Sequence, residues 1–276
     1  MPTSTTCMAS SPPEPPFDQL GGDATLLDQS WDAVLATLDA RVAQLLPACL
    51  HFAEQTPALL ADGLSYEQRI GERGLVAMRR DSLHDLYGAL MWLRWPRTKW
   101  AIHQGQLAGI RAHGAKRRSR HQQALAHIDE AGLVVASHDA SLFEALHAHD
   151  WAGLLGARRS DWSAACVRVL GHALFELRRT RPHDLLAGKV IGVQVPSAWR
   201  PDAGGLAALD ACVAQALLDG RAAADPKDLP TLPLAAVPDW DPRNADPAFI
   251  ASAPCFRPRP AARKYAPWLL LPTTNN

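Results

Sequence analysis

The feature that most constrains the fold is the stretch over residues 83–95, LHDLYGALMWLRW, which is apolar on nearly every side of the helix it predicts. One helical stripe consists of Leu83, Leu86, Tyr87, Leu90 and Leu93. Another side carries Gly88, Met91, Trp92 and Trp95. A helix that is apolar almost all round is usually buried. We therefore expect this stretch to be the central helix of a globular domain, ended by Pro96.

Composition supports a globular protein without a strong overall charge. The chain has 276 residues, 47% of them hydrophobic, and its 28 Lys and Arg residues balance 28 Asp and Glu residues. The net charge of the protein therefore creates no electrostatic field that would attract it to nucleic acid or to an anionic membrane. The N-terminus lacks the pattern of a secretory signal, and no apolar run approaches the length of a membrane span. We expect a cytoplasmic protein that does not enter the membrane.

Five cysteines are spread along the chain without any Cys-x-x-Cys pair. They are Cys7, Cys49, Cys166, Cys212 and Cys255. An odd number at wide spacing is not typical of a disulfide framework or of a cysteine zinc site. Reduced thiols fit the expected cytoplasmic location.

Periodicity predicts a mainly α fold, of the α+β type, with a minor sheet of short strands in a single globular domain. Apolar residues recur at helical spacing over 30–46, 121–129, 140–159, 161–180 and 203–222, and less regularly over 49–70, where Pro57 and Gly63 interrupt the pattern. Residues 133–135 and 189–196 favour short strands.

Composition also divides the chain into three regions. Residues 1–24 are rich in Ser, Thr and Pro and are predicted to form a disordered tail. Residues 25–224 are predicted to form the helical domain. Prolines recur through residues 225–276, which predicts an extended segment wrapping that domain.

Four blocks carry a family resemblance, and they occur in order along the chain. They are HDLYGALMWLRWPRTKWAIH over 84–103, ALAHIDEAGLVVAS over 124–137, VLGHALFELRR over 169–179, and PLAAVPDWDPRNADPAFI over 233–250 followed by PCFRPRP. Together they resemble the bacterial family called domain of unknown function 3025. The resemblance implies the extent of a domain and does not assign an activity to it. The chain departs from the family pattern at Gly88, where asparagine is common, and at Gln123 and Ala126, where aspartate and threonine are common.

His84 and Asp85 stand near the start of the central helix and have two interpretations. An imidazole titrates near neutral pH and binds divalent metals, so His84 is a candidate metal ligand and Asp85 a candidate catalytic residue. In the alternative, Ser82 or Asp81 caps the helix, Asp85 interacts with the helix dipole, and His84 is a buried histidine with a hydrogen bond.

His172 and Glu176 lie four residues apart, on one face of a predicted helix. At this spacing two side chains share a metal, or one orients the other, or they simply hydrogen-bond to each other. Gly171 before them permits close approach of another backbone. Asp129 and Glu130 end another helix, and one of these carboxylates would complete a site with His84 and His172.

We assign His84, Asp129 and His172 as metal ligands, with Asp85 and Glu176 as catalytic residues. Mixed nitrogen and oxygen ligands suit zinc, manganese or iron. In the structural alternative, Asp129 and Glu130 belong to an ordinary turn and the histidines have local partners.

Two groups of basic residues are candidate binding sites. Arg94, Arg97 and Lys99 follow the central helix and would hold an anionic substrate, although the helix dipole and the neighbouring tryptophans also explain them. A second run consists of Lys116, Arg117, Arg118 and Arg120. It would contact phosphate or RNA, but solvated basic loops are common and no aromatic residues are interleaved with it.

Familiar catalytic motifs are missing from the sequence. It contains no Walker loop, Rossmann glycine triplet, Gly-x-Ser-x-Gly elbow or His-Glu-x-x-His helix. The leading hypothesis is an enzyme with a histidine and carboxylate site, a metal-assisted hydrolase of a small or phosphorylated substrate. The alternative is a non-catalytic binding or scaffold protein whose partner is a protein or RNA and whose polar residues are structural.

Overall fold

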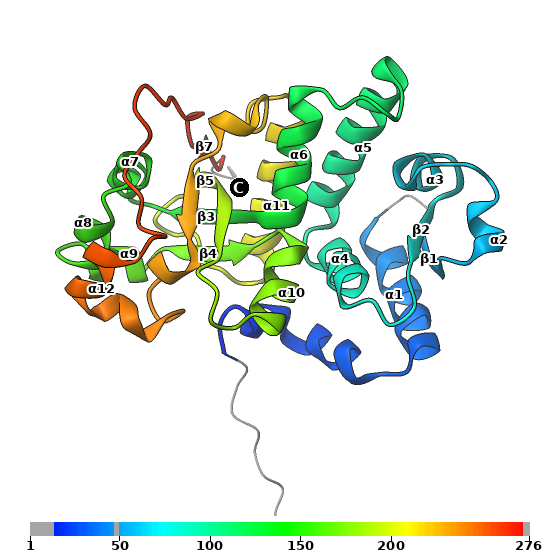
Figure 1. Cartoon of the computed structure of the whole chain (residues 1–276), viewed down its shortest axis with the longest axis horizontal. Helices are drawn as coiled ribbons and strands as arrows, with labels where there is room; N and C mark the ends of the chain where they lie inside the picture. The colour runs from blue at the N-terminus through cyan, green and yellow to red at the C-terminus, as the bar shows by residue number, and fades with distance from the viewer. Residues whose placement is uncertain (1–13, 47–49, 273–276) are drawn as a thin grey trace, which may run out of the picture.

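The predicted central helix is α4, Leu83–Arg94. In the computed structural model, which describes residues 14–46 and 50–272, it packs against α1 (Trp31–Leu45), α5 (Pro96–His113) and α10 (His172–Thr180). Figure 1 shows α4 between α1 and α10. Its buried residues are Leu86, Tyr87, Ala89, Leu90, Met91, Trp92 and Leu93. They lie on several sides of the helix, which confirms the prediction of a central buried helix.

Pro96 ends α4 and also begins α5, a helix that the sequence pattern did not predict. Proline lacks the N–H that would continue α4, but its fixed φ suits the first position of a new helix. Only Trp95 separates the two helices. Arg94 therefore lies at the end of α4, whereas Arg97 and Lys99 lie in the first turn of α5, so the three cations do not share one helix terminus.

A small mixed sheet lies beside the helices. Its strand order is β4 (Cys166–Val169), β3 (Gly132–Ser137), β5 (Ala187–Gln194) and β6 (Thr231–Pro233), and β7 (Leu269–Leu270) also pairs with β5. β3 and β5 are parallel, in the register Val134 with Ile191. Every residue of β3 is buried, as expected for an inner strand covered on both faces. The predicted mainly α fold with a minor sheet is confirmed.

The remaining helices surround this arrangement (Figure 1). They are α2 (Pro57–Leu60), α3 (Tyr66–Arg73), α6 (Arg120–Ala131), α7 (Ala140–Ala148), α8 (Trp151–Leu155), α9 (Arg159–Ser163), α11 (Ala203–Leu218) and α12 (Pro247–Ser252), with 3-10 turns over 226–228, 234–236 and 242–245. Within the described ranges, no helix combines the length and apolarity needed to cross a bilayer. Cys166, Cys212 and Cys255 form no disulfide, and Cys7 and Cys49 lie outside the described residues.

Folded structure begins before the predicted boundary at residue 24. Residues Phe17–Asp28 form a 3-10 helix with Leu20 and Leu26 buried, while residues 1–13 of the predicted tail lie outside the described part. The Gln19 side chain donates to the carbonyl of Val167 at 3.1 Å and accepts from the N–H of Val169 at 2.9 Å. Both groups belong to β4, so this glutamine pairs with an edge strand as a neighbouring strand would.

Two segments predicted to be helical contain strands. Residues His51–Glu54 form β1, which pairs in parallel with β2 (Leu75–Met78), and Cys166–Val169 form β4. Both strands are only four residues long, so helical and alternating patterns are hard to separate in them. The expected helix end at Pro47 lies outside the described residues.

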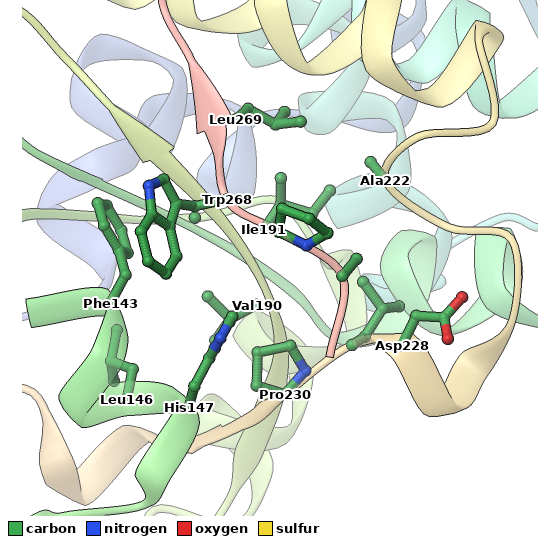
Figure 2. A pocket seen from close by; sticks show the side chains of 14 residues that line it. Phe143, Leu146, His147, Val190, Ile191, Ala222, Asp228, Pro230, Trp268 and Leu269 are labelled. Carbon is green, nitrogen blue, oxygen red and sulfur yellow. The ribbon is translucent and has the colours of Figure 1, made fainter. Parts of the chain in front are cut away.

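The proline-rich segment 225–276 joins the sheet through β6 and β7, so it does more than wrap the domain. Figure 2 shows Trp268 beside Phe143 of α7, and the two rings stack at a centroid distance of 5.5 Å. The hollow beside them, lined also by His147 and Ile191, measures about 20 Å³. That is room for one water molecule, so this pocket is a packing defect under the C-terminal segment.

Helix α5 has no capping side chain of its own, and Asp210 of α11 replaces it. The Asp210 carboxylate accepts the N–H of Arg97 at 3.0 Å and that of Thr98 at 2.9 Å. We expect Asp210→Ala to lower the free energy of unfolding by about 1 to 3 kcal/mol, because two N–H groups lose their acceptor in a buried position. Asp210→Asn keeps one acceptor oxygen and should give an intermediate loss. Urea unfolding measures both, and an alanine variant as stable as the wild type would contradict this role.

Candidate functional site

A cavity of about 730 Å³ lies between α3, β2, α4, α5, α6 and α10. Its size is within the range of pockets that bind small molecules. Its polar lining includes His84, Asp85, Lys99, His127, Asp129, Glu130 and His172. The cavity therefore brings together most of the residues that the sequence singled out, from four different helices.

Two histidines face each other at the wall of this cavity. The Nε2 atoms of His84 and His172 are 3.0 Å apart, and the rings meet edge to face. His84 Nδ1 lies 2.7 Å from a Glu176 oxygen. A carboxylate only accepts hydrogen bonds, so His84 carries its proton on Nδ1 and donates it to Glu176. His84 Nε2 is the ring nitrogen that faces His172.

Glu130 completes a group of three donor atoms. A Glu130 oxygen is 3.6 Å from His172 Nε2, and the ligand atoms of His84, Glu130 and His172 all lie within 4.8 Å of one another. Half of the Glu130 side chain is exposed, whereas His172 is buried. Two imidazoles and one carboxylate at this separation are able to hold a divalent metal.

Asp129, the carboxylate assigned as a ligand from the sequence, has another partner. It forms an ion pair with the buried ammonium of Lys99, which also lies 5.4 Å from the centre of the Trp92 ring. Burial acts to raise the pKa of Asp129, but Lys99 and His172 hold it below its ordinary value. Asp129 therefore stays ionised beside the histidines, and Glu130 is the carboxylate that lies nearest to the Nε2 atom of His172.

His172 has one nitrogen without a partner. Its Nδ1 is buried and makes no hydrogen bond with a described residue, and the nearest carboxylate oxygen, of Asp129, is 4.0 Å away. Burial lowers the pKa of His172 despite the attraction of Asp129, so the imidazole is neutral near pH 7. A neutral imidazole is the form that binds metals.

Close backbone packing at Gly171 brings His172 to the acidic residues. The N–H groups of Leu170 and Gly171 both donate to the carbonyl of Gly132 at 2.9 Å. A Cβ on Gly171 would lie 2.3 Å from the Gly132 nitrogen and 2.4 Å from the Ala131 Cα. Only glycine fits there, which confirms the predicted close approach and places the start of α10 against the end of α6.

Asp85 and Glu176, the two predicted catalytic residues, have structural contacts. Asp85 accepts hydrogen bonds from the backbone and guanidinium of Arg79 at 2.6 to 3.0 Å. Although burial acts to raise its pKa, Arg79 holds it below the ordinary value. Ser82 caps α4 through the Asp85 N–H, as the structural alternative expected. Glu176 does not line the cavity but orients His84.

The structure separates the three cations predicted to bind one substrate. Arg94 approaches Asp23 at 3.5 Å, and the Arg97 N–H bonds to Asp210. Both residues lie outside the lining of the cavity, and only Lys99 of the three contributes to it. The three residues belong to two helices, because α4 ends at Arg94 and α5 begins after the break at Trp95.

Sequence reasoning missed the cavity wall formed by α5. Its lining residues are Lys99, Ile102, Gln106 and Ile110, which recur every three or four residues and so form one face of the helix. The sequence contains this pattern, but a proline that follows an apolar helix indicates a helix end more directly than a helix start. Two of the positions that depart from the family pattern, Gly88 and Ala126, line the cavity, whereas Gln123 bonds to Arg120 at 3.3 Å.

Gly171 and Gly88 offer a matched test of this packing. We expect Gly171→Ala to lower the free energy of unfolding by about 1 to 3 kcal/mol, because its Cβ meets backbone atoms that cannot move aside cheaply. In Gly88→Ala the new Cβ meets the His172 ring at 3.8 Å, an ordinary contact, so stability should not fall. Thermal and urea unfolding of both variants measure this. Equal stability of the two variants would contradict the role given to Gly171.

Comparison with known proteins gives one match. A family model described as protein of unknown function (DUF3025) matches residues 50–260, which is well over half of the chain. Comparisons with curated proteins and with solved structures gave no match. The matched range contains the whole cavity lining, from Gln55 to His172. The chain therefore belongs to the DUF3025 family of proteins of unknown function.

Proposed function

We propose that this protein is a metal-dependent hydrolase in which His84, His172 and Glu130 bind one divalent metal. The proposal depends on one observation: their three donor atoms lie within 4.8 Å of one another at the wall of a cavity of about 730 Å³. Two histidines and a glutamate form the ligand set of many catalytic zinc sites, which keep a further position for water.

The surroundings of the histidines support this proposal. Glu176 accepts the Nδ1 proton of His84 and so leaves Nε2 available for a metal, an arrangement common around metal-bound histidines. A metal on His172 Nε2 would require the proton of that ring to be on Nδ1. The Nδ1–H group would then point toward Asp129, 4.0 Å away. The buried nitrogen without a hydrogen bond would then serve to hold the proton that leaves Nε2 free for the metal.

The chemistry expected at such a site is hydrolysis. A divalent metal lowers the pKa of its bound water toward neutrality and supplies a hydroxide nucleophile. The hydroxide would attack a carbonyl or phosphoryl centre held in the cavity, the bond to the leaving group would break, and the leaving group would take up a proton. Zinc suits the ligands best, and manganese and iron suit them too. We place this activity in the cytoplasm of a bacterium, as the cysteine pattern and the family resemblance suggest.

Metal content tests the proposed ligands. We expect about one equivalent of zinc, manganese or iron in protein purified without a histidine tag, and its loss in His84→Ala, His172→Ala and Glu130→Gln. His127→Ala is the control, because His127 lines the same cavity but does not belong to the group of three. Elemental analysis gives the stoichiometry. Wild-type protein that takes up no metal even when supplied with it would refute the proposal and favour the non-catalytic alternative.

Removal of the metal tests the reaction class. A chelator should abolish hydrolysis of p-nitrophenyl ester or phosphate substrates, and added zinc, manganese or iron(II) should restore it. Glu176→Gln should retain the metal less tightly, by roughly 10- to 100-fold, because the hydrogen bond that orients His84 is weakened. Hydrolysis that continues unchanged in the chelated protein would exclude a metal-dependent mechanism.

A further inference from the structure

The cavity is long, because it follows the paired helices α5 and α6. The lining residues of α5 extend from Lys99 to Ile110, and at 1.5 Å per residue these are about 16 Å apart along the axis. The connection between α5 and α6 turns the chain back, so the start of α6 lies near the end of α5 (Figure 1). Asp129 and Glu130 near the end of α6 therefore lie close to Lys99, and the proposed metal ligands are at one end of the cavity.

Arg118 lies at the other end, in the connection between α5 and α6. It lines the cavity and is exposed, and it forms no ion pair or hydrogen bond with another described residue. The other lysine and arginine residues in the lining are already paired, Arg79 with Asp85 and Lys99 with Asp129. Arg118 is therefore the guanidinium in this part of the structure that is available to a bound molecule.

The middle of the cavity offers apolar contacts, and the Glu67 carboxylate there is hydrogen-bonded to His103 at 2.6 Å. Ile102 and Ala126 line this middle part, and Ile110 lines the part toward Arg118. Gln106 and Gln122 also line the middle part, but each side-chain amide donates to the backbone carbonyl of the other, at 2.9 and 3.2 Å. A ligand that extends along this section would gain from an uncharged, largely apolar body.

We propose that the cavity binds an elongated organic anion, with its carboxylate or phosphate at Arg118 and its apolar body along α5 and α6. A guanidinium binds either anion through two parallel hydrogen bonds. For the reaction, this inference rests on the proposed function. The bond to be hydrolysed then lies at the metal end of the cavity, at the end of the bound molecule that is remote from its anionic group.

Binding of short amphiphiles to the full-length protein tests the anion site apart from the metal. The probes are octanoate, octyl phosphate and the neutral octanamide, measured by calorimetry in the presence of a chelator so that no metal competes for the anion. We expect Arg118→Ala to raise the dissociation constants of octanoate and octyl phosphate at least tenfold and to leave that of octanamide unchanged. Arg118→Lys should restore part of the lost affinity. The anion that the wild-type protein binds with the lower dissociation constant shows whether a carboxylate or a phosphate is the preferred group.

Arg117→Ala is the matched control. Arg117 is the adjacent exposed arginine and does not line the cavity, so its removal should not weaken the binding of the two anions. Equal weakening by both variants, octanamide binding as tight as octanoate binding, or no binding of any probe would overturn the anion site. Metal content is measured on the same samples. Anion binding that depends on Arg118 in a protein without metal affinity would refute the hydrolase alone, whereas a metal-loaded protein indifferent to Arg118 would refute the anion site alone.

Discussion

The structure of the site depends on the contact between Gly171 and the backbone at Ala131 and Gly132. One carbonyl, that of Gly132, accepts two N–H groups from the segment that leads into α10. This contact joins the end of α6, the start of β3 and the start of α10 within one small volume. His172 follows directly, and Asp129 and Glu130 directly precede, so their proximity is set by backbone packing and not by long side chains that would lose entropy on ordering.

The other histidine reaches the same place through the buried helix α4. That helix is fixed by apolar contacts on several sides, and it presents His84 at its start, where Glu176 of α10 holds the ring. The polar groups around the pair are largely satisfied by one another, with Lys99 on Asp129 and Arg79 on Asp85. Rigid elements and hydrogen-bonded neighbours are what a site needs if its donor atoms are to stay in place before a ligand arrives.

Much of this arrangement could be predicted from the sequence, for identifiable reasons. The apolar residues of α4 predicted a buried helix, and the glycine before His172 predicted a close backbone contact. From the sequence we assigned Asp129 as a ligand, whereas in the structure it is the Glu130 oxygen that lies with the donor atoms of the two histidines. Neighbouring residues on a helix point in different directions, and their directions relative to α4 and α10 depend on packing. Sequence reasoning also missed α5, because the same proline is compatible with the end of one helix and with the start of the next. The strands β1 and β4 were too short for their period to be recognised.

The position of β5 has a consequence for how the chain reaches its native state. This strand pairs with β3, with β6 and, at Val193 and Gln194, with Leu269 and Leu270. The last pairing joins residues more than seventy positions apart, across a stretch that includes α11, β6 and α12. Contacts of such high sequence separation carry a large loop-closure cost and slow the search for the native topology. The helices around the cavity carry the same cost, because α4 packs against α10 and α5 packs against α11. His84 and His172 are 88 positions apart, and Arg97 and Asp210 are 113 apart. The sheet and the helical part therefore both close over long stretches of chain, and neither is a locally formed template for the other.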